Sequence, residues 1–236
     1  QIAIIVNGSN DRAVIGGTDT GDVVEDVNTY SNVSASANMI HTRGQLNIAD
    51  ADTGEARFEF KTFIHSAMNP EWAPYASQLG GRLSIDKTGD WEYEIDTTKA
   101  QIQALGVGET LKDTVVIHSV DGTEHTIALT IHGTNDAPIC SSEVTLHSGT
   151  EDTNQTFTLS QLLANTTDVD ANDLHKLHVD SVLADHGSVT KNPDGSFTFH
   201  PDKDYNGQVH FSYDVQDAHG GVTHTGASTT LSAVND

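Results

Sequence analysis

Carboxylates in recurring motifs are the residues of this sequence that could do chemistry. Each half of the chain carries, in the same order, an acidic pair, an Asp-x-Asp and an aspartate in front of a glycine turn. These are Val24-Glu25-Asp26, Asp50-Ala51-Asp52 and Asp121-Gly122, then Thr150-Glu151-Asp152, Asp168-Val169-Asp170 and Asp217. Clustered carboxylates repel one another unless a cation neutralises them. Since Ca²⁺ takes about six to eight oxygen ligands, usually from several loops, the motifs predict cation sites.

Asn-Asp pairs mark the ends of the repeated unit. Asn10-Asp11, Asn135-Asp136 and Asn235-Asp236 each follow an alternating apolar stretch, and the aspartates are 125 and then 100 residues apart. Repeats of this size are whole domains. We therefore expect residues 1–11 to end a preceding repeat, and 12–136 and 137–236 to be two domains. Because the sequence opens inside an apparent strand, Gln1 to Val6, we expect a piece of a longer protein.

The composition excludes several classes of partner. The formal net charge of −23 disfavours nucleic acid and anionic membrane surfaces, both of which need basic patches. No apolar run approaches the ~20 residues of a membrane span. With 36% hydrophobic residues, the chain can bury a core despite its acidity. Cys140 is the only cysteine, so no internal disulfide can form, and no motif supplies it with a base.

The hydrophobic pattern predicts an all-β protein. Residues 114–120, 125–132 and 208–215 alternate with a period of two, and turn signals come roughly every ten residues. In each half a glycine turn leads into an aromatic alternation, at Trp91 and Tyr93 and again at Phe197 and Phe199. Helical signal is limited to residues 97–105 and 159–164. Many short strands of this kind favour β-sandwiches.

Two resemblances follow from these motifs. Residues 22–138, with GDWEYEID and ADADTGEARF, resemble a VCBS repeat, although the stretch Phe63–Gly81 is longer than usual. Residues 139–236, with TDVDANDLHKLHV and NPDGSFTFHPDKDYNG, resemble a bacterial cadherin-like repeat. The resemblance implies two tandem Ig/cadherin-like Greek-key β-sandwich domains. Both repeats occur in long arrays in large RTX-type adhesins of Gram-negative bacteria.

The resemblance also implies where calcium would bind. A site between the domains would use Glu25, Asp96, Asn135, Asp136, Asp168, Asp170 and Asp217. A similar half-site upstream would use Asn10, Asp11, Asp50, Asp52 and Asp121, and one downstream would use Glu151, Asp202 or Asp204, Asn235 and Asp236. The alternative for any single motif is a solvated turn, because Asp and Asn favour turns through local hydrogen bonds.

Other chemistries have weaker support. The 13 histidines include His175 and His178, but no HExxH or Cys-His pairing predicts zinc. No nucleophile or nucleotide-binding motif is present, so we expect no enzyme. Trp72 and Tyr75, in the long stretch 63–81, could recognise a sugar or peptide, or could pack that loop onto the sandwich.

The resulting hypothesis is a calcium-rigidified extender segment of a secreted bacterial surface adhesin, involved in cell adhesion and biofilm formation. The alternative is a glycan- or peptide-binding module that uses residues 63–81. We expect an extracellular, surface-located monomer exported by type I secretion. Its expected partners are neighbouring repeats of the same chain, and host or bacterial surface glycans or proteins reached through other modules. Nucleic acid and membrane insertion are not expected.

Overall fold

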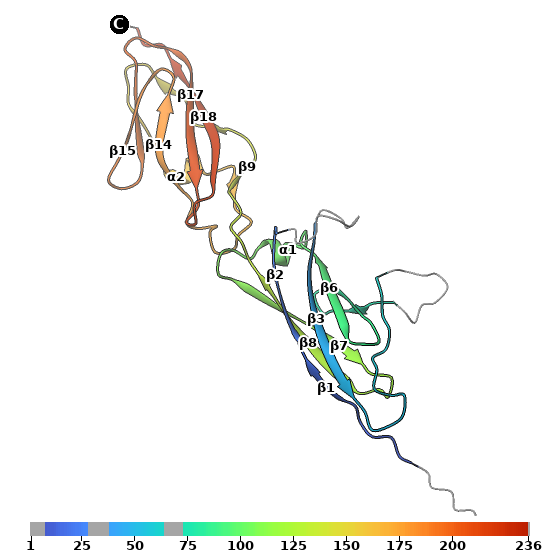
Figure 1. Cartoon of the computed structure of the whole chain (residues 1–236). Helices are drawn as coiled ribbons and strands as arrows, with labels where there is room; N and C mark the ends of the chain where they lie inside the picture. The colour runs from blue at the N-terminus through green and yellow to red at the C-terminus, as the bar shows by residue number, and fades with distance from the viewer. Residues whose placement is uncertain (1–7, 28–37, 64–72, 236) are drawn as a thin grey trace, which may run out of the picture. The chain divides into compact units, whose positions relative to one another are not determined.

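A computed structural model describes residues 8–27, 38–63 and 73–235 of the chain (Figure 1). It divides into two compact units, residues 1–103 with 108–134 and residues 104–107 with 135–236. The domain boundaries expected from the Asn-Asp pairs stay predictions. The expected strand Gln1 to Val6, Trp72 and Asp236 lie outside the described residues.

The first unit is built from two sheets. One has the strand order β1-β3-β6-β5-β4 and the other β2-β8-β7. The strands are β1 Val14–Gly17, β2 Thr20–Val24, β3 Met39–Ala49, β4 Tyr75–Ala76, β5 Arg82–Ile85, β6 Asp90–Asp96, β7 Thr110–His118 and β8 Glu124–His132. A short helix, α1 (Ala100–Gln103), follows β6.

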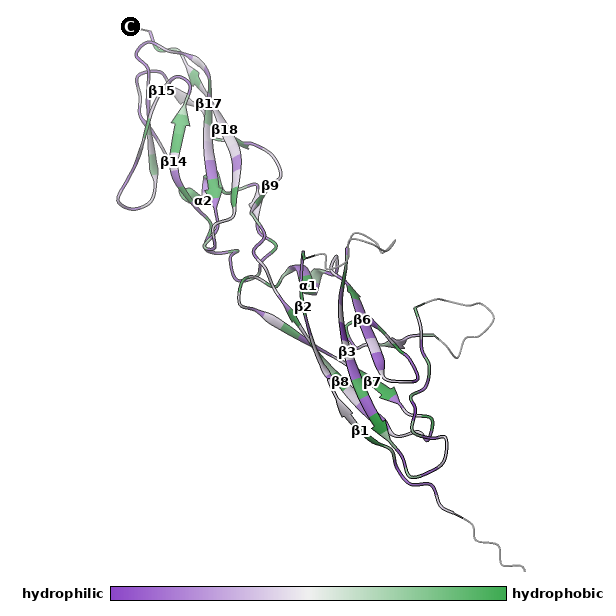
Figure 2. Ribbon diagram, in the orientation of Figure 1, coloured by the Kyte–Doolittle hydropathy of each residue, from purple (hydrophilic) through white to green (hydrophobic). Residues whose placement is uncertain are grey.

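The period-two alternation places one side of the longer strands in the core. On β6 the inward residues are Trp91, Tyr93 and Ile95, and on β8 they are Ile127, Leu129 and Ile131. Along β6 in Figure 2, purple bands alternate with pale ones, because Trp and Tyr stand near the middle of this hydropathy scale. Burial of these apolar side chains stabilises the unit by about 25 cal/mol for each Å² removed from water.

The second unit has one larger sheet and two small ones. The larger has the order β10-β18-β17-β14, with β11 also paired to β18, and the others are β12-β16-β15 and β13-β9. The strands are β9 Ile139–Cys140, β10 Val144–Thr145, β11 Gly149–Thr150, β12 Gln155–Phe157, β13 Thr166–Thr167, β14 His178–Ala184, β15 Gly187–Lys191, β16 Phe197–Pro201, β17 Gly207–Gln216 and β18 Val222–Ser232.

An aromatic cluster forms the centre of this second core. The rings of Phe157 and Phe199 each meet Phe211 edge to face, with centroids 5.2 and 5.0 Å away. Helix α2 (Leu159–Leu162) begins with a capping box in which Thr158 and Gln161 satisfy each other's backbone N–H groups. Cys140 lies on β9 as a free, half-buried thiol beside Thr166.

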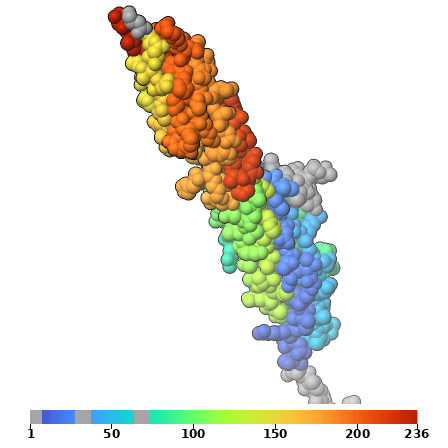
Figure 3. Space-filling model, turned by 90° about the vertical axis from the view of Figure 1, so that its left-hand side faces the viewer, coloured from blue at the N-terminus to red at the C-terminus, as the bar shows by residue number. Residues whose placement is uncertain are grey.

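Parallel pairing of the early and last strands is common to both units. β2 runs parallel to β8, with Thr20 opposite Ala128, and β10 and β11 run parallel to β18. In Figure 3 the blue of β2 lies beside the green of the β7–β8 hairpin. This pairing brings the residues after β2 next to those after β8, and the residues after β11 next to those after β18.

The all-β prediction is confirmed. The three alternating stretches are strands β7, β8 and β17, and the expected helical segments are single turns, α1 and α2. Tyr75 packs onto the sandwich, because its hydroxyl donates to Glu59 and accepts from the His118 backbone N–H, at 3.2 and 3.1 Å. No helix among the described residues is long and apolar enough to cross a membrane.

Candidate metal sites

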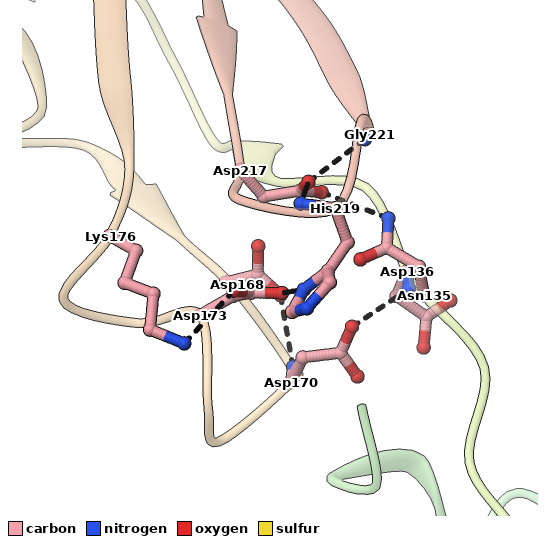
Figure 4. A network of polar contacts seen from close by, with 9 residues as sticks. All are labelled: Asn135, Asp136, Asp168, Asp170, Asp173, Lys176, Asp217, His219 and Gly221. Carbon is pink, nitrogen blue, oxygen red and sulfur yellow. Dashed lines mark hydrogen bonds and ion pairs between the residues drawn. The ribbon is translucent and has the colours of Figure 1, made fainter. Parts of the chain in front are cut away.

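Each unit has an end at which its Asp-x-Asp motif and its hairpin aspartate meet, here called the aspartate end. In the second unit the Asp-x-Asp follows β13, and Asp217 lies in the turn between β17 and β18. Figure 4 shows these side chains with Asn135 and Asp136. The fold thereby brings together five of the predicted ligands: Asn135, Asp136, Asp168, Asp170 and Asp217.

Hydrogen bonds from the backbone fix the carboxylates of this end. The N–H of Asp136 donates to Asp170 Oδ2 at 2.9 Å, and the N–H of Asp170 donates to Asp168 Oδ1 at 2.9 Å. Asp217 Oδ1 accepts from the N–H groups of His219 and Gly221. A Cβ on Gly221 would lie 2.1 Å from Asp217 Oδ2, so this close approach requires glycine.

Asp173 is a further acidic residue of this end, and the sequence analysis missed it. It is fully buried, accepts a contact of 2.6 Å from His219 Nδ1, and lies 3.9 Å from Lys176 Nζ. Its N–H donates to the Asp170 carbonyl at 3.1 Å, so the turn after the Asp-x-Asp carries it back to the motif. The available signal was its position three residues after Asp170.

The electrostatics show carboxylates that are short of positive partners. Burial, followed by the negative charges of Asp217 and Asp173, raises the pKa of Asp168. Burial and the neighbouring carboxylates Asp168, Asp173 and Asp217 likewise raise the pKa of Asp170. Burial also acts on Asp217, but hydrogen bonds from Asn135, His219 and Gly221 outweigh it and lower the pKa.

Several buried oxygens of this end lack a hydrogen-bond partner among the described residues. They are Asp168 Oδ2, Asp170 Oδ1 and Asn135 Oδ1, and Asp170 is fully buried. An unsatisfied buried acceptor costs about 1–3 kcal/mol, and more when it is charged. The donor set contains only oxygen, which is what a hard divalent cation takes. The residues present therefore fit calcium.

The first unit repeats this arrangement at its own aspartate end. The N–H of Asp11 donates to Asp52 Oδ2 at 2.7 Å, and the N–H of Asp52 donates to Asp50 Oδ1 at 2.8 Å. Carboxylate oxygens of Asp50, Asp52 and Glu55 all lie within 4.8 Å of one another. Glu55 stands three residues after Asp52, as Asp173 does after Asp170, and was also missed.

Asp121 completes this end from the β7–β8 turn. Its carboxylate accepts from the Ala13 N–H at 3.2 Å, and with Asn10 it lines a hollow of about 560 Å³. Hydrogen bonds from Ser119 and Thr123 lower the pKa of Asp121. Asp50 Oδ2 and Glu55 Oε2 are buried without a hydrogen-bond partner among the described residues. The segment 10–13 thus contacts the Asp-x-Asp through the N–H of Asp11 and contacts Asp121 through the N–H of Ala13.

A buried glutamate marks the other end of each unit, here called the glutamate end. Glu25 follows β2 and accepts the Thr134 N–H at 2.8 Å, while Glu151 follows β11 and accepts the Val234 N–H at 2.7 Å. Both lie below 9% exposure. The next residue in each case, Asp26 or Asp152, has φ of 57°, a left-handed conformation that Asp tolerates.

Asp96 is placed in a local turn. Its Oδ1 accepts from the Thr98 N–H at 2.9 Å and from the Thr98 hydroxyl at 2.8 Å, and these bonds lower its pKa. This is the solvated-turn alternative that Asp motifs leave open. A metal site shared by Glu25, Asp96 and the second unit stays a prediction.

Comparison with family models finds a similarity that lies mainly in the second unit. The family model of a cadherin-like domain matches residues 134–232. No curated protein sequence is similar enough to count as a relative.

Among solved structures, the chain is similar to the protocadherin GammaB4 extracellular domain, with a TM-score of 0.48, 13% identity, and coverage of 93% of this chain and 33% of that one. It is also similar to human mucin-like protocadherin EC1-2, with a TM-score of 0.47, 13% identity, and coverage of 94% and 99%. An endo-fucoidan hydrolase of glycoside hydrolase family 107 matches with a TM-score of 0.31, 16% identity, and coverage of 66% and 22%.

The chain thus spans a third of the protocadherin GammaB4 chain and less of the hydrolase. Over residues 134–232 it is similar to cadherin-like domains, which are modules of the extracellular adhesion type.

Proposed function

We propose that this chain is a calcium-binding extender segment of a secreted bacterial surface adhesin. One observation carries the proposal: the two units present the same aspartate end, with oxygen ligands fixed by equivalent backbone hydrogen bonds. A repeated cation site is expected of a module that recurs in series, since each copy brings its own ligands.

Calcium would stabilise each aspartate end by replacing mutual repulsion with shared attraction. Asp168 and Asp170 would supply carboxylate oxygens in the second unit, and Asp50, Asp52 and Glu55 in the first. An ion that binds only the folded state stabilises that state by RT ln(1 + [L]/Kd). At a hundredfold excess over Kd this amounts to about 2.7 kcal/mol for each site.

The strand pairing supports a mechanical role. β2 is parallel and adjacent to β8 over residues 20–24, and β10 and β11 are parallel and adjacent to β18. Tension between an early strand and the last strand then shears the hydrogen bonds between them, so several bonds must break together. Resistance to force is governed by the unfolding rate. A bound ion lowers this rate when its contacts must be broken before the transition state of unfolding is reached.

Two measurements test this proposal. Titration calorimetry should find at least one calcium site in each unit, with one lost in Asp50→Asn/Asp52→Asn and another in Asp168→Asn/Asp170→Asn. Single-molecule pulling on the whole chain should then show higher unfolding forces in calcium than in chelator. Calcium binding that leaves the unfolding forces unchanged would remove the mechanical role and retain the metal sites.

Recognition of a glycan or peptide through residues 63–81 remains the alternative proposal. Tyr75 is occupied by Glu59 and His118, as described above, and Trp72 lies outside the described residues. Binding of a glycan panel by the wild-type chain, abolished in Trp72→Ala, would favour this alternative.

A further inference from the structure

A hollow in the first unit has a charge opposite to that of the chain. It measures about 640 Å³ and is lined by residues 57–61 together with Lys87 and Val120. Arg57, Lys61 and Lys87 contribute three positive charges, against the single negative charge of Glu59. The whole sequence has 34 acidic and 11 basic residues. We call this hollow the cationic groove.

Two of its cations have no carboxylate partner among the described residues. Lys61 Nζ lies 3.6 Å from Glu59 Oε2, so these two form a pair. Arg57 and Lys87 are exposed and, in the part of the chain that the structure describes, neither has a carboxylate within ion-pair distance. Their charges therefore face the groove and the solvent.

An apolar surface lies beside these charges. Phe58 is 1% exposed and forms the floor, while Phe60 and Val120 are partly exposed at the sides. Phe60 also borders two adjoining hollows of about 410 and 390 Å³, the first lined in addition by Arg43 and Trp91. Phe60 is common to all three linings, but the two adjoining hollows also include Asp86, Asp90 and Glu92, so the excess of positive charge is confined to the cationic groove itself.

Much of the backbone of the groove is already hydrogen-bonded to neighbouring turns and strands. The N–H groups of Phe58, Glu59 and Lys61 donate to the carbonyls of Lys87, His118 and Ile85. The carbonyls of Arg57 and Lys61 accept from Val120 and Ile85. Residues 57–61 thus tie the β5–β6 hairpin to the β7–β8 turn. A peptide cannot add here as a β-strand, because strand addition needs unpaired backbone groups.

Recognition must therefore come from side chains that offer both charge and an apolar face. We propose that the cationic groove binds an acidic oligosaccharide, one that carries carboxylate or sulfate groups on its sugar rings. The anionic groups would meet Arg57 and Lys87, because guanidinium and ammonium groups form charge-assisted hydrogen bonds to such oxygens. The C–H face of a ring would lie against Phe60, as apolar sugar faces do on aromatic surfaces. None of these residues belongs to an aspartate end.

The test is titration calorimetry of the whole chain with defined oligosaccharides. The probes are a galacturonic acid tetramer and a sulfated dextran tetramer, with maltotetraose as the neutral probe and hexaglutamate as the peptide probe. Chelator is present throughout because uronates themselves bind calcium, and circular dichroism verifies that the chain stays folded. The two anionic saccharides distinguish a carboxylate-bearing ligand from a sulfated one.

The decisive variant is Arg57→Gln/Lys87→Gln, and Lys99→Gln/Lys112→Gln is the control with the same change in net charge. We expect an anionic saccharide to bind, maltotetraose not to bind, and the Arg57/Lys87 variant to lose at least about fivefold in affinity while the control loses little. If neither anionic saccharide binds, or if the two variants lose affinity equally, the proposal that the cationic groove binds an acidic oligosaccharide is wrong. Equal binding of hexaglutamate would overturn the saccharide assignment.

Discussion

The backbone N–H of Asp136 donates to the carboxylate of Asp170 at 2.9 Å, and Asp11 and Asp52 repeat this bond at 2.7 Å in the first unit. In each unit, therefore, an Asn-Asp pair is held against an Asp-x-Asp that follows it by about 30 to 40 residues. The bond positions Oδ2 of the second aspartate of each Asp-x-Asp, Asp170 or Asp52. The other carboxylate oxygen of that residue is directed toward the neighbouring carboxylates. This arrangement is the local geometry on which the first two predictions depend.

Replacement of Asp170 by asparagine should have opposite effects with and without calcium. In chelator, Asp170→Asn should stabilise the second unit, because it removes one of several repelling buried charges and keeps an acceptor for the Asp136 N–H. In excess calcium the same variant should be less stable than wild type, because a ligand is lost. Thermal melts in both buffers measure the two effects.

Asp194→Asn serves as the control for this crossover. Asp194 is an exposed turn residue of the same unit that accepts from Ser196, and the change in charge is the same. Its effect should be the same in calcium and in chelator. Parallel behaviour of the two variants would contradict a calcium site at Asp170.

The stability of the second unit in chelator should rise as the pH is lowered from neutral toward about 4. The pKa values of Asp168 and Asp170 are raised in the folded state, so that state binds protons more tightly than the unfolded chain. Their contribution is complete below the unfolded value of 3.8 and is lost as the pH rises through their folded pKa values.

The pKa of Asp217 is lowered, so its contribution has the opposite sign and is lost as the pH falls below 3.8. Melts at several pH values should therefore show a maximum in chelator. In Asp168→Asn/Asp170→Asn, the gain in stability on lowering the pH from neutral toward 3.8 should be smaller than in wild type. A gain of unchanged size would show that Asp168 and Asp170 are not its source.

Loss of Glu151 should destabilise the last strand of the second unit. Its Oε1 accepts from the Val234 N–H and its Oε2 from Asn206 Nδ2, at 2.7 and 3.1 Å, in a site that is 5% exposed. Glu151→Ala removes both hydrogen bonds to the carboxylate and should cost about 1.5–3 kcal/mol, the range for hydrogen bonds to charged groups. Hydrogen exchange of the β18 amides should accelerate accordingly.

Glu151→Gln is the informative comparison, because it keeps an acceptor for the Val234 N–H. It should cost less than Glu151→Ala, whereas Glu143→Ala, at an exposed position, should change exchange little. Equal exchange in Glu151→Ala and wild type would mean that the glutamate end does not hold β18 in place.

Gly44 should not tolerate a methyl group. A Cβ at this position would lie 2.4 Å from Cζ2 of Trp91, whose ring is 2% exposed and whose Nε1 donates to the Thr18 carbonyl. Gly44→Ala should therefore destabilise the first unit by about 1–3 kcal/mol, as overpacking does. Denaturant unfolding followed by tryptophan fluorescence measures this change.

Gly16→Ala is the matched control, since a Cβ there meets nothing within 4 Å. It should change the free energy of unfolding by less than about 0.5 kcal/mol. A similar loss in both variants would indicate that strand propensity, and not contact with Trp91, sets the cost.

The class of fold and the order of the motifs could be predicted from the amino-acid pattern alone. Period-two alternation predicted β7, β8 and β17, because a strand with one buried face must repeat every second residue. The repeated Asp-x-Asp and Asn-Asp pairs predicted cation sites and units of domain length, and the resemblance to cadherin-like repeats implied which residues meet at each site.

Tertiary structure decided which further groups join them. Glu55 and Asp173 reach the aspartate ends because the turns after Asp52 and Asp170 carry the chain back, and a spacing of three residues does not specify that path. The Oδ1 atom of Asp96 accepts from Thr98 in a local turn, and the role of Asp96 as a ligand stays a prediction. The cationic groove joins Arg57, Lys87 and Val120, which are far apart in sequence. Charge and hydrophobic pattern are local properties of a chain, whereas the convergence of side chains depends on how strands pair and where turns direct them.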